Sequence, residues 1–491
     1  MVLEIMDTVS KFLPSIRSPA KPLSLREKMV WTVSILAVYF LLYNTYAIGV
    51  SPAQITQPLE QLISIIFAAR IGSLITVGIS PIVLSSIVLQ LLAGSDLIKV
   101  DMNDPAQKAR FQTLQKLAAI VIAVIEAVIY VSTQYVAVTS PSYAIVVMLQ
   151  LIAGALIIII MDEMMTKYGI TSGINLFIAS GVSYAIVAGT AGIILPEAAA
   201  AIAAGTTASF SNALLAFGPL FFAVLVFLIS IYAYETKVEL PLAFEQLRGI
   251  GGRLPIPFLY VSVLPVILAS SLELSLTVWL RFLNGISGSF GNIAKFIALY
   301  SPVSSTAGGG TSLQLTGGLA YLISPSFPLP YSSNYGGVGG YAAYFNYLLT
   351  TNTAKLVLPW GGFVLVPEWI HVIIYTLVLV VLCVIFGKFW IEMTGQSPKN
   401  MAQQLAEMGW QIPGFRRDPR IVESVLNKYI PTITVLGSIF VGLLAALATL
   451  TGAVGSGMGI LLTVGIIYMV YQQLEQERIY DAYPILNKIA K

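Results

Sequence analysis

The sequence has 491 residues, of which 57% are hydrophobic and 10% are charged, and its formal net charge is +3. A soluble domain carries roughly 25% charged residues, so these side chains could not cover a water-facing surface of this size. The composition therefore excludes a soluble globular protein and indicates a polytopic membrane protein, in which each span takes about 20 apolar residues.

Ten apolar segments are long enough to span a membrane, and all are expected to be α-helical. We place them near 29–48, 62–94, 112–134, 143–161, 172–193, 213–234, 258–280, 367–391, 430–450 and 457–474. Before the first span, segment 1–28 carries apolar residues at helical spacing, which predicts a short amphipathic helix on the membrane surface. These residues are Ile5, Val9, Phe12 and Ile16.

The second apolar segment, 62–94, is too long for one upright span and contains Gly72, Gly78 and Pro81. Glycine and proline break or kink helices. Two interpretations fit equally well. One is a half-span that begins on the outer side, with Arg70 near water, and ends near the midplane; the other is a single tilted and kinked helix.

Lysine and arginine are placed unevenly along the chain. Of the 26 such residues, the only ones in segments assigned to the outer side are Arg70, Arg281, Lys295 and Lys355. The positive-inside rule therefore predicts that both termini lie in the cytoplasm, including the C-terminal tail 475–491. It assigns the polar loops 235–257 and 392–429 to the same side.

Two outer segments differ in composition. Segment 194–212 is predicted to be an external hinge loop between a first half, 29–193, and a second half, 213–474. Segment 281–366 is long and rich in Gly, Ser, Tyr and Pro. This predicts an external cap of irregular backbone or short strands, and a surface insertion without a role is an equally good interpretation.

The two halves contain matching sequences. Pro81–Ser86 in the second span resembles Pro265–Ser270 in the seventh. Ser172–Tyr184 in the fifth span resembles Ser456–Tyr468 in the tenth. Because an odd number of spans separates the members of each pair, the two five-helix halves are expected to have inverted orientations. Inverted repeats place a working path at their interface near the midplane.

The matched segments supply branched aliphatic side chains and no charge at their centres. A narrow apolar constriction excludes water and ions, and bulky aliphatics could contact a passing chain whatever its sequence. These side chains are Ile79, Val83, Ile174, Ile178, Ile267 and Leu462. Ordinary helix packing is the alternative interpretation of each.

Other function classes need groups that the matched segments lack. A secondary transporter fits inverted repeats and broken helices, but it requires ionisable groups at the midplane. The chain offers mainly Glu126 and Glu273, which lie outside the matched segments. A structural scaffold without a pore is a further alternative.

An intramembrane enzyme would need a catalytic constellation or a metal cluster. Asp162 and Glu163 beside Lys167 are expected to form a solvated turn instead. The chain has one cysteine, Cys383, and one histidine, His371, far from any acidic cluster. We therefore expect no metal site, no cofactor and no enzymatic activity.

Two motifs resemble signatures of the SecY family of protein-conducting channels. Arg70–Val83, followed by Gln90-Leu91-Leu92, resembles the signature of the second helix in that family. Lys167–Leu176 resembles the signature at the start of the fifth helix. Pro413-Gly414-Phe415-Arg416 is closer to the archaeal and eukaryotic forms than to the bacterial form. The similarity covers most of the chain, from about Leu23 to Gln473, and diverges mainly in the cap.

The resemblance implies an all-α, ten-helix channel that passes unfolded secretory chains, admits signal sequences and opens sideways to membrane lipid. The six aliphatics named above would form its pore ring. The plug would be the first part of the second span, about 62–73, with Leu62, Ile65, Ile66, Phe67, Arg70, Ile71, Gly72 and Ser73.

The lateral gate would lie between spans 2 and 3 on one side and spans 7 and 8 on the other. There Glu126 matches a carboxylate near the plug and gate of the family, and such a group is costly in a membrane unless it is paired or hydrated. Leu84 replaces a usual Ser or Thr, and Ser275 replaces an amide. We therefore expect apolar contact to stabilise this gate more than it does in relatives that have the polar cluster.

Five arginines match the tips of the two cytoplasmic loops that dock the ribosome in this family. They are Arg248, Arg253, Arg416, Arg417 and Arg420. Arginine binds phosphate well, and topogenic charge is the alternative interpretation. The resemblance further implies two small single-span partners, of the SecE (gamma) and beta types. It also implies a plasma-membrane location and no DNA partner.

Overall fold

The computed structural model describes the chain in fourteen stretches. They are residues 16–21, 23–50, 66–94, 105–203, 209–244, 251–261, 264–285, 291–304, 311–325, 327, 341–352, 354–407, 410–411 and 419–482. The predicted amphipathic helix before the first span lies outside these residues, apart from Ile16.

The first half is built from five long helices. They are α2 (Leu25–Asn44), α4 (Ser80–Gly94), α5 (Pro105–Ser132), α6 (Ala144–Tyr168) and α7 (Gly173–Gly189). A 3₁₀ turn, η3 (Pro141–Tyr143), precedes α6, and a π turn, η4 (Thr190–Ile194), follows α7. Ser24 and Glu27 form a capping box that starts α2.

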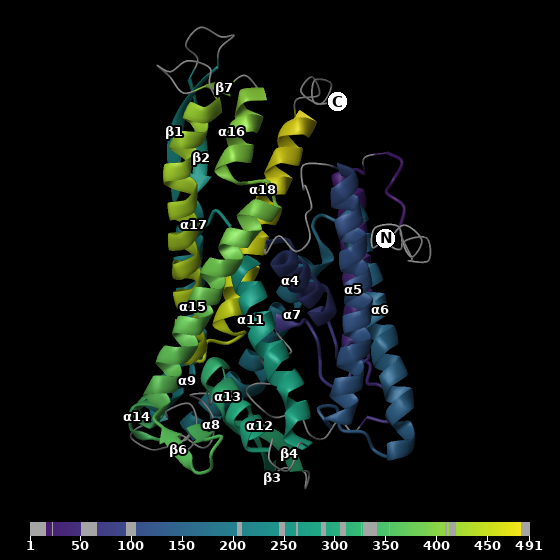
Figure 1. Cartoon of the computed structure of the whole chain (residues 1–491), viewed down its shortest axis with the longest axis vertical. Coiled ribbons are helices and arrows are strands. Elements are labelled where there is room, and N and C mark those ends of the chain that lie inside the picture. The colour runs from purple at the N-terminus through teal and green to yellow at the C-terminus, as the bar shows by residue number, and fades with distance from the viewer. Residues whose placement is uncertain are drawn as a thin grey trace.

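The second half contributes the other five long helices. They are α10 (Gly218–Glu235), α11 (Leu264–Trp279), α15 (Glu368–Met393), α17 (Pro419–Leu450) and α18 (Gly457–Ala482). Seven of the ten, namely α5, α6, α7, α10, α11, α15 and α17, are long and apolar enough to cross a membrane, and α4 and much of α18 are shorter apolar helices. Each predicted span thus contains one of these helices. Figure 1 shows α5 and α6 on one side of the molecule, α15 and α17 on the other, and α4, α7 and α11 between them.

Two small sheets lie at opposite ends of the bundle (Figure 1). The first has the order β2-β1-β7 and consists of β1 (Lys237–Phe244), β2 (Gly251–Pro257) and β7 (Trp410–Gln411), with α16 (Pro398–Glu407) in contact with β7. Its β1–β2 hairpin is antiparallel, with Lys237 opposite Pro257. The sequence did not predict strands in this polar loop.

The second sheet lies in the cap and has the order β3-β4-β5-β6. Its strands are β3 (Leu299–Ser304), β4 (Thr311–Gly317), β5 (Ala354–Val357) and β6 (Phe363–Val366). The cap also contains helical elements that the sequence did not predict, namely η5 (Leu280–Gly285), α12 (Gly291–Ile297), α13 (Leu319–Ile323) and α14 (Tyr341–Thr350).

The predicted hinge loop 194–212 is wrong over most of its described residues. They form α8 (Leu195–Ala203) and the start of α9 (Ser209–Ala216). The alanine-rich run after Pro196 has a high helix propensity, and Ala198 packs against Ala216 in a small apolar cluster. Likewise, α17 begins well before the predicted span, because Val422 and Leu426 are buried against the β1–β2 end of the molecule.

The long segment 62–94 is not one helix, because α4 begins only at Ser80. The chain before it turns back on itself, and the amide N–H of Ile79 donates to the carbonyl oxygen of Phe67 over 2.9 Å. Gly78 makes this turn possible. It has φ +60°, and a Cβ there would lie 2.2 Å from the same carbonyl oxygen. The interpretation as one kinked helix is therefore wrong for residues 67–79.

The turned segment is held between α2 and α6. The amide of Ala47 donates to the carbonyl of Gly72 over 2.9 Å, and the amide of Leu74 donates to the carbonyl of Thr45 over 3.0 Å. On the other side, a Cβ on Gly154 of α6 would lie 1.8 Å from the carbonyl oxygen of Leu74. Only a glycine lets this backbone approach α6 so closely.

We expect Gly154→Ala to destabilise the fold by about 1–3 kcal/mol, because the added methyl group must displace a packed backbone segment. The measurement is the midpoint of thermal unfolding in lipid nanodiscs. Gly192→Ala is the matched control, since no atom lies within 4 Å of a Cβ built there. Equal midpoints for the two variants would contradict the close packing of residues 66–79 on α6.

Candidate functional site

The six predicted ring aliphatics lie in the first two turns of four helices, or directly before them. Ile79 and Val83 belong to the start of α4, Ile174 and Ile178 to α7, Ile267 to α11 and Leu462 to α18. Five of them are at most 4% exposed, Ile174 is half-buried, and all six belong to one apolar core that both halves share. Because α4 contacts α11 and α7 contacts α18, this core joins the two halves.

The matched segments of the repeat begin their helices in similar ways. Pro81 and Pro265 are the second residues of α4 and α11, where the missing N–H of proline costs nothing. Ser172 and Ser456 directly precede α7 and α18. The hydroxyl of Ser456 accepts the amide N–H of Gly459 over 3.1 Å and caps α18. The internal repeat is therefore present in the structure.

Residues 66–79 lie in the first half directly before α4, and the last of them, Ile79, is a ring position. The hydroxyl of Tyr39 on α2 donates to the carbonyl oxygen of Ala68 over 2.8 Å. The guanidinium of Arg70 donates to the side-chain oxygen of Asn44 over 2.9 Å. The first four residues of the segment are at most 1% exposed. The predicted plug residues found here are Ile66, Phe67, Arg70, Ile71, Gly72 and Ser73, while Leu62 and Ile65 lie outside the described residues.

Glu126 on α5 is fully buried, and the structure identifies the partner that the sequence left open. The hydroxyl of Ser80, the first residue of α4, donates to one carboxylate oxygen of Glu126 over 2.7 Å. The indole of Trp279 on α11 lies near the same carboxylate. Glu126 therefore links the start of α4 to α5 and faces the second half.

Seven buried polar atoms of α4, α5 and α11 have no hydrogen-bond partner within the described part of the chain. They are Oε1 of Gln90 on α4, Oε2 of Glu126 on α5 and, on α11, Oγ of Ser271, both carboxylate oxygens of Glu273, Oγ of Ser275 and Nε1 of Trp279. Each such atom costs about 1–3 kcal/mol when buried. Leu84 is 3% exposed on α4, and α4 contacts α11 and α15. The seam between the halves thus combines buried apolar side chains with polar groups whose hydrogen bonds are unmet among the described residues.

The prediction of a solvated turn at Asp162 and Glu163 is wrong, because both residues lie in α6. The apolar stripe of this helix continues past them, with Met165 fully buried. A carboxylate oxygen of Asp162 accepts the amide N–H of Ile174 over 2.9 Å. Asp162 therefore caps the N-terminus of α7, the helix that presents Ile174 and Ile178 to the shared core.

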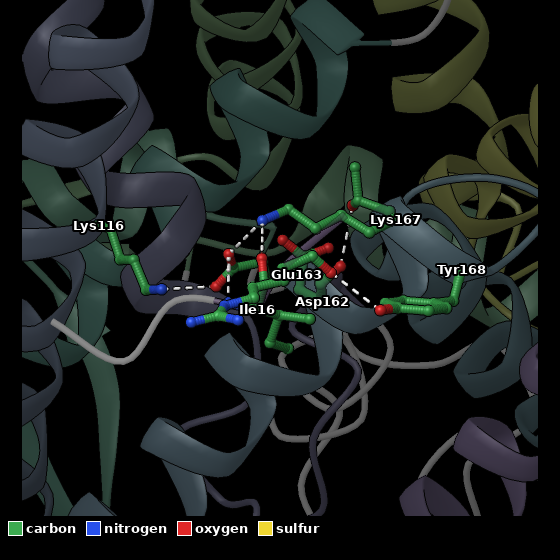
Figure 2. A network of polar contacts seen from close by, with 8 residues as sticks. Ile16, Lys116, Asp162, Glu163, Lys167 and Tyr168 are labelled. Atoms are coloured by element: carbon green, nitrogen blue, oxygen red, sulfur yellow. Dashed lines mark hydrogen bonds and ion pairs between the residues drawn. The ribbon is translucent and has the colours of Figure 1, made fainter. Parts of the chain in front are cut away.

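Glu163 is the centre of a polar network at the same end of α6 (Figure 2). It forms ion pairs with Lys116 on α5 over 2.5 Å and with Lys167 over 2.8 Å. It also accepts the amide N–H of Ile16 over 3.1 Å, and Tyr168 donates to the carbonyl of Arg17 over 2.9 Å. The network ties the stretch before α2 to α5 and to the end of α6, beside a cavity of about 450 Å³.

His371 belongs to a second buried network, at the cap end of α15. Its Nδ1 lies 3.0 Å from a carboxylate oxygen of Glu368, and its Nε2 lies 3.0 Å from the carbonyl oxygen of Ser324. Tyr321 on α13 donates to the other carboxylate oxygen of Glu368 over 2.8 Å. The lone histidine thus fastens the cap to α15. Within the described ranges, no group of three or more His, Cys, Asp or Glu side chains is placed to hold a metal ion.

The predicted docking arginines are described only in part. Arg253 on β2 is exposed and donates to Glu239 across the hairpin over 2.8 Å, and this hydrogen bond holds the pKa of Glu239 below its usual range. Arg420 is exposed at the start of α17. Arg248, Arg416 and Arg417 lie outside the described residues.

Sequence reasoning missed Ser80, Trp279 and the capping role of Asp162. Ser80 carried a signal, since a small hydroxyl residue before Pro81 is common at a helix start. Trp279 carried none, because it acts on a helix that is distant in the chain, and Asp162 carried none, because an acidic residue inside one helix does not show that it caps the next.

The comparisons with known proteins agree with this geometry. The family model described as SecY matches residues 73–471. The chain is 35% identical over 489 residues to the "Protein translocase subunit SecY" of Methanocaldococcus jannaschii, covering 97% of each chain.

Three solved structures resemble this one, and each comparison covers 97% of this chain and 98% of the other. The first, described as "The structure of a protein conducting channel", has a TM-score of 0.75 at 33% identity. The second, with a TM-score of 0.73 at 34% identity, concerns a SecY plug domain that stabilises the closed state of the translocation channel and maintains a membrane seal. The third is Sec61 in the canine ribosome-channel complex from the endoplasmic reticulum, with a TM-score of 0.72 at 32% identity.

We expect Ser80→Ala to destabilise the chain by about 1–3 kcal/mol, because it removes the hydrogen bond that the buried carboxylate of Glu126 accepts. Ser85→Ala is the matched control. Ser85 is equally buried on α4, but its hydroxyl donates only to the carbonyl of Ile82 in the same helix. The measurement is thermal unfolding of both variants in nanodiscs. A larger loss for Ser85→Ala than for Ser80→Ala would contradict the assigned partner of Glu126.

Proposed function

The chain belongs to the SecY family and is the pore-forming subunit of a protein translocation channel, and on this premise we propose which of its residues form the seal, the plug, the lateral gate and the ribosome-docking surface. The chain passes unfolded secretory polypeptide across the membrane and releases transmembrane segments sideways into lipid. Its task is therefore to open for a polypeptide while it keeps out ions.

The seal is assigned to the pore ring of Ile79, Val83, Ile174, Ile178, Ile267 and Leu462. The observation that carries this assignment is their common position in the apolar core that joins the halves, at the starts of four helices. A constriction lined only by aliphatics dewets, and it can close around an extended chain without reading its sequence. Asp162 and Ser456 hold two of these helix starts in place.

The plug is assigned to residues 62–73. Support comes from the turn that folds the described residues 66–73 back beside the ring positions of α4, and from the plug of the SecY structure that resembles this chain. The hydrogen bonds of Tyr39 and Arg70 would keep the plug in its closed position.

The lateral gate is assigned to the seam where α4 and α5 meet α11 and α15, near Leu84, Glu126 and Ser275. The unmet hydrogen bonds along this seam favour the assignment, because water or an entering peptide backbone would satisfy them when the seam opens. Closure would then depend mainly on apolar contact, which Leu84 supplies.

We further propose that both termini and the β1–β2 hairpin face the cytoplasm of a cell-membrane channel, with the cap outside. The distribution of lysine and arginine supports this orientation. Two small single-span subunits, of the SecE (gamma) and beta types, would complete the channel. A motor such as a translating ribosome must supply the energy, since the chain is proposed to make and break no covalent bonds.

The ring assignment predicts that a translocating chain touches its side chains directly. In a Cys383→Ala background, single cysteines replace Val83, Ile178 and Leu462, and a stalled secretory chain carries a photocrosslinker. We expect crosslinks at all three positions and none at Val147→Cys. Val147 is the control because it is as buried as the three ring residues but lies on α6, at the cap end of the first half. Absence of crosslinks at the three ring positions, with ribosome docking intact, would contradict the ring assignment.

Ribosome docking is assigned to the arginines of the two cytoplasmic loops, and Arg253 is the clearest described case. The ribosome complex of the similar Sec61 channel supports this partner. We expect Arg253→Glu to weaken ribosome binding and to lower the slope of log K against log salt by about 1, because one phosphate contact is lost.

Lys237→Glu is the matched control, because it makes the same charge change at the base of the same hairpin. The measurement is cosedimentation with ribosomes at several salt concentrations. An equal loss for both variants would show that only net charge acts, and the assignment of Arg253 would be withdrawn.

A further inference from the structure

An apolar surface on the cap is left uncovered at the end of α15. It consists of α14 and the β5–β6 hairpin, residues 341–352 and 354–366, and we name it the aromatic foot. Figure 1 shows α14 and β6 beside one another at the lower left, at the base of α15. From residue 341 to residue 367 the sequence carries a single charge, that of Lys355.

The hairpin presents large apolar side chains to its surroundings. Trp360, at its tip, is 81% exposed, and Phe363, Val364 and Leu365 on the edge strand β6 are each about half exposed. An exposed, apolar edge strand is a liability in water, and proteins that keep one in water protect it with charges. The one nearby charge, the ammonium of Lys355, packs 4.3 Å from the ring centroid of Phe363.

Helix α14 is apolar on both of its faces. Tyr344 and Leu348 are buried, while Phe345 and Leu349 on the other side are 45% and 70% exposed. A helix that is hydrophobic all round is stable only when something apolar covers each face. The described residues cover one face of α14 and leave the other, with Phe345 and Leu349, exposed.

The foot is rigidly attached to helices that span the membrane. The hydroxyl of Tyr344 donates to the carbonyl of Leu450 at the end of α17 over 3.0 Å. The amide N–H of Glu368, the first residue of α15, donates to the carbonyl of Thr351 over 3.0 Å. The foot is therefore fixed at the level where these two helices leave the apolar core.

The exposed surface of the foot continues into the lipid-facing stripe of α15. That stripe recurs every four residues and consists of Trp369, Ile373, Leu377, Val381 and Ile385, each exposed. Between the edge strand, which ends at Val366, and this stripe, only Pro367 and the buried Glu368 intervene. Because α15 is apolar and long enough to cross a membrane, lipid is the expected cover of this stripe, and no exposed charge separates the stripe from the foot along the chain.

We propose that the aromatic foot is a membrane-interface anchor, whose occupant is the lipid of the outer leaflet at the level of the headgroups. Tryptophan and tyrosine are enriched at this depth because their rings are apolar and their N–H or O–H groups are polar. Lys355 can bury its carbon chain and extend its ammonium to lipid phosphates. The foot thereby fixes the outer end of α15, one of the helices at the seam between the halves, to the leaflet.

The test measures the depth of single nitroxide labels in the full chain with its copurifying subunits, reconstituted in vesicles of phosphatidylcholine with a minority of phosphatidylglycerol. Labels are attached in the Cys383→Ala background at Trp360→Cys and Phe363→Cys. Both positions are exposed, so the fold should tolerate the labels. Val238→Cys is the matched control, an exposed apolar residue on the β1–β2 hairpin at the opposite end of the molecule, flanked by Lys237 and Glu239.

We expect the ratio of collisions with oxygen to collisions with a water-soluble nickel chelate to be severalfold higher at positions 360 and 363 than at position 238. Equal ratios at all three positions would place the foot in water and overturn the proposal. Labels at 360 and 363 that are shielded from both reagents would indicate a protein cover, such as a partner or a second copy, and would overturn it as well.

Discussion

An empty passage through a membrane must stay closed to ions, and we propose that this chain closes it with apolar contact between side chains of its two halves. Water and ions are excluded because the aliphatic side chains offer them no hydrogen bond. The proposed ring lies at the first turns of α4, α7, α11 and α18, so such a seal would exist only while these helix starts hold their positions. Much of the remaining structure can be understood as support for those four helix starts.

The supports are local and polar, whereas the seal is apolar. Asp162 caps α7 from the neighbouring helix, Ser456 caps α18, and Ser80 connects the start of α4 to Glu126. Gly78 allows the chain to turn back before α4. Each of these contacts lies inside one half, and so they can persist while the halves separate. We propose that the buried polar atoms left unmet among the described residues of the seam lower the free energy needed to open it.

The sequence predicted the structure best where a local pattern, such as an apolar run or a proline, is compatible with few conformations. Hydropathy predicted a helix in each of ten segments, because a membrane leaves few alternatives to an apolar helix, although the second segment also holds a turn before its helix. The repeat around Pro81 and Pro265 identified two of the helix starts, since proline is tolerated in the first turn. The resemblance to SecY, confirmed by the comparisons, excluded the transporter alternative that local patterns had kept open.

The sequence was least informative where a contact joins distant segments. The loop predicted at 194–212 is largely helical, because Ala198 finds an apolar partner in α9. Asp162 and Glu163 have the composition of a turn, yet packing of α6 keeps them helical and gives each a partner elsewhere. His371 lies at the edge of an apolar run, and only the fold of the cap brings Ser324 to its ring. Such contacts depend on tertiary packing, which no local pattern encodes.

The seal is tested most directly by ionic current through the purified channel in planar lipid bilayers, with the six ring aliphatics unchanged or all replaced by serine. If apolar contact closes the passage, the unchanged channel carries no sustained current and the serine variant conducts constantly, because water can then wet the constriction. A serine variant that folds, docks ribosomes and remains as tight to ions as the unchanged channel would contradict the account.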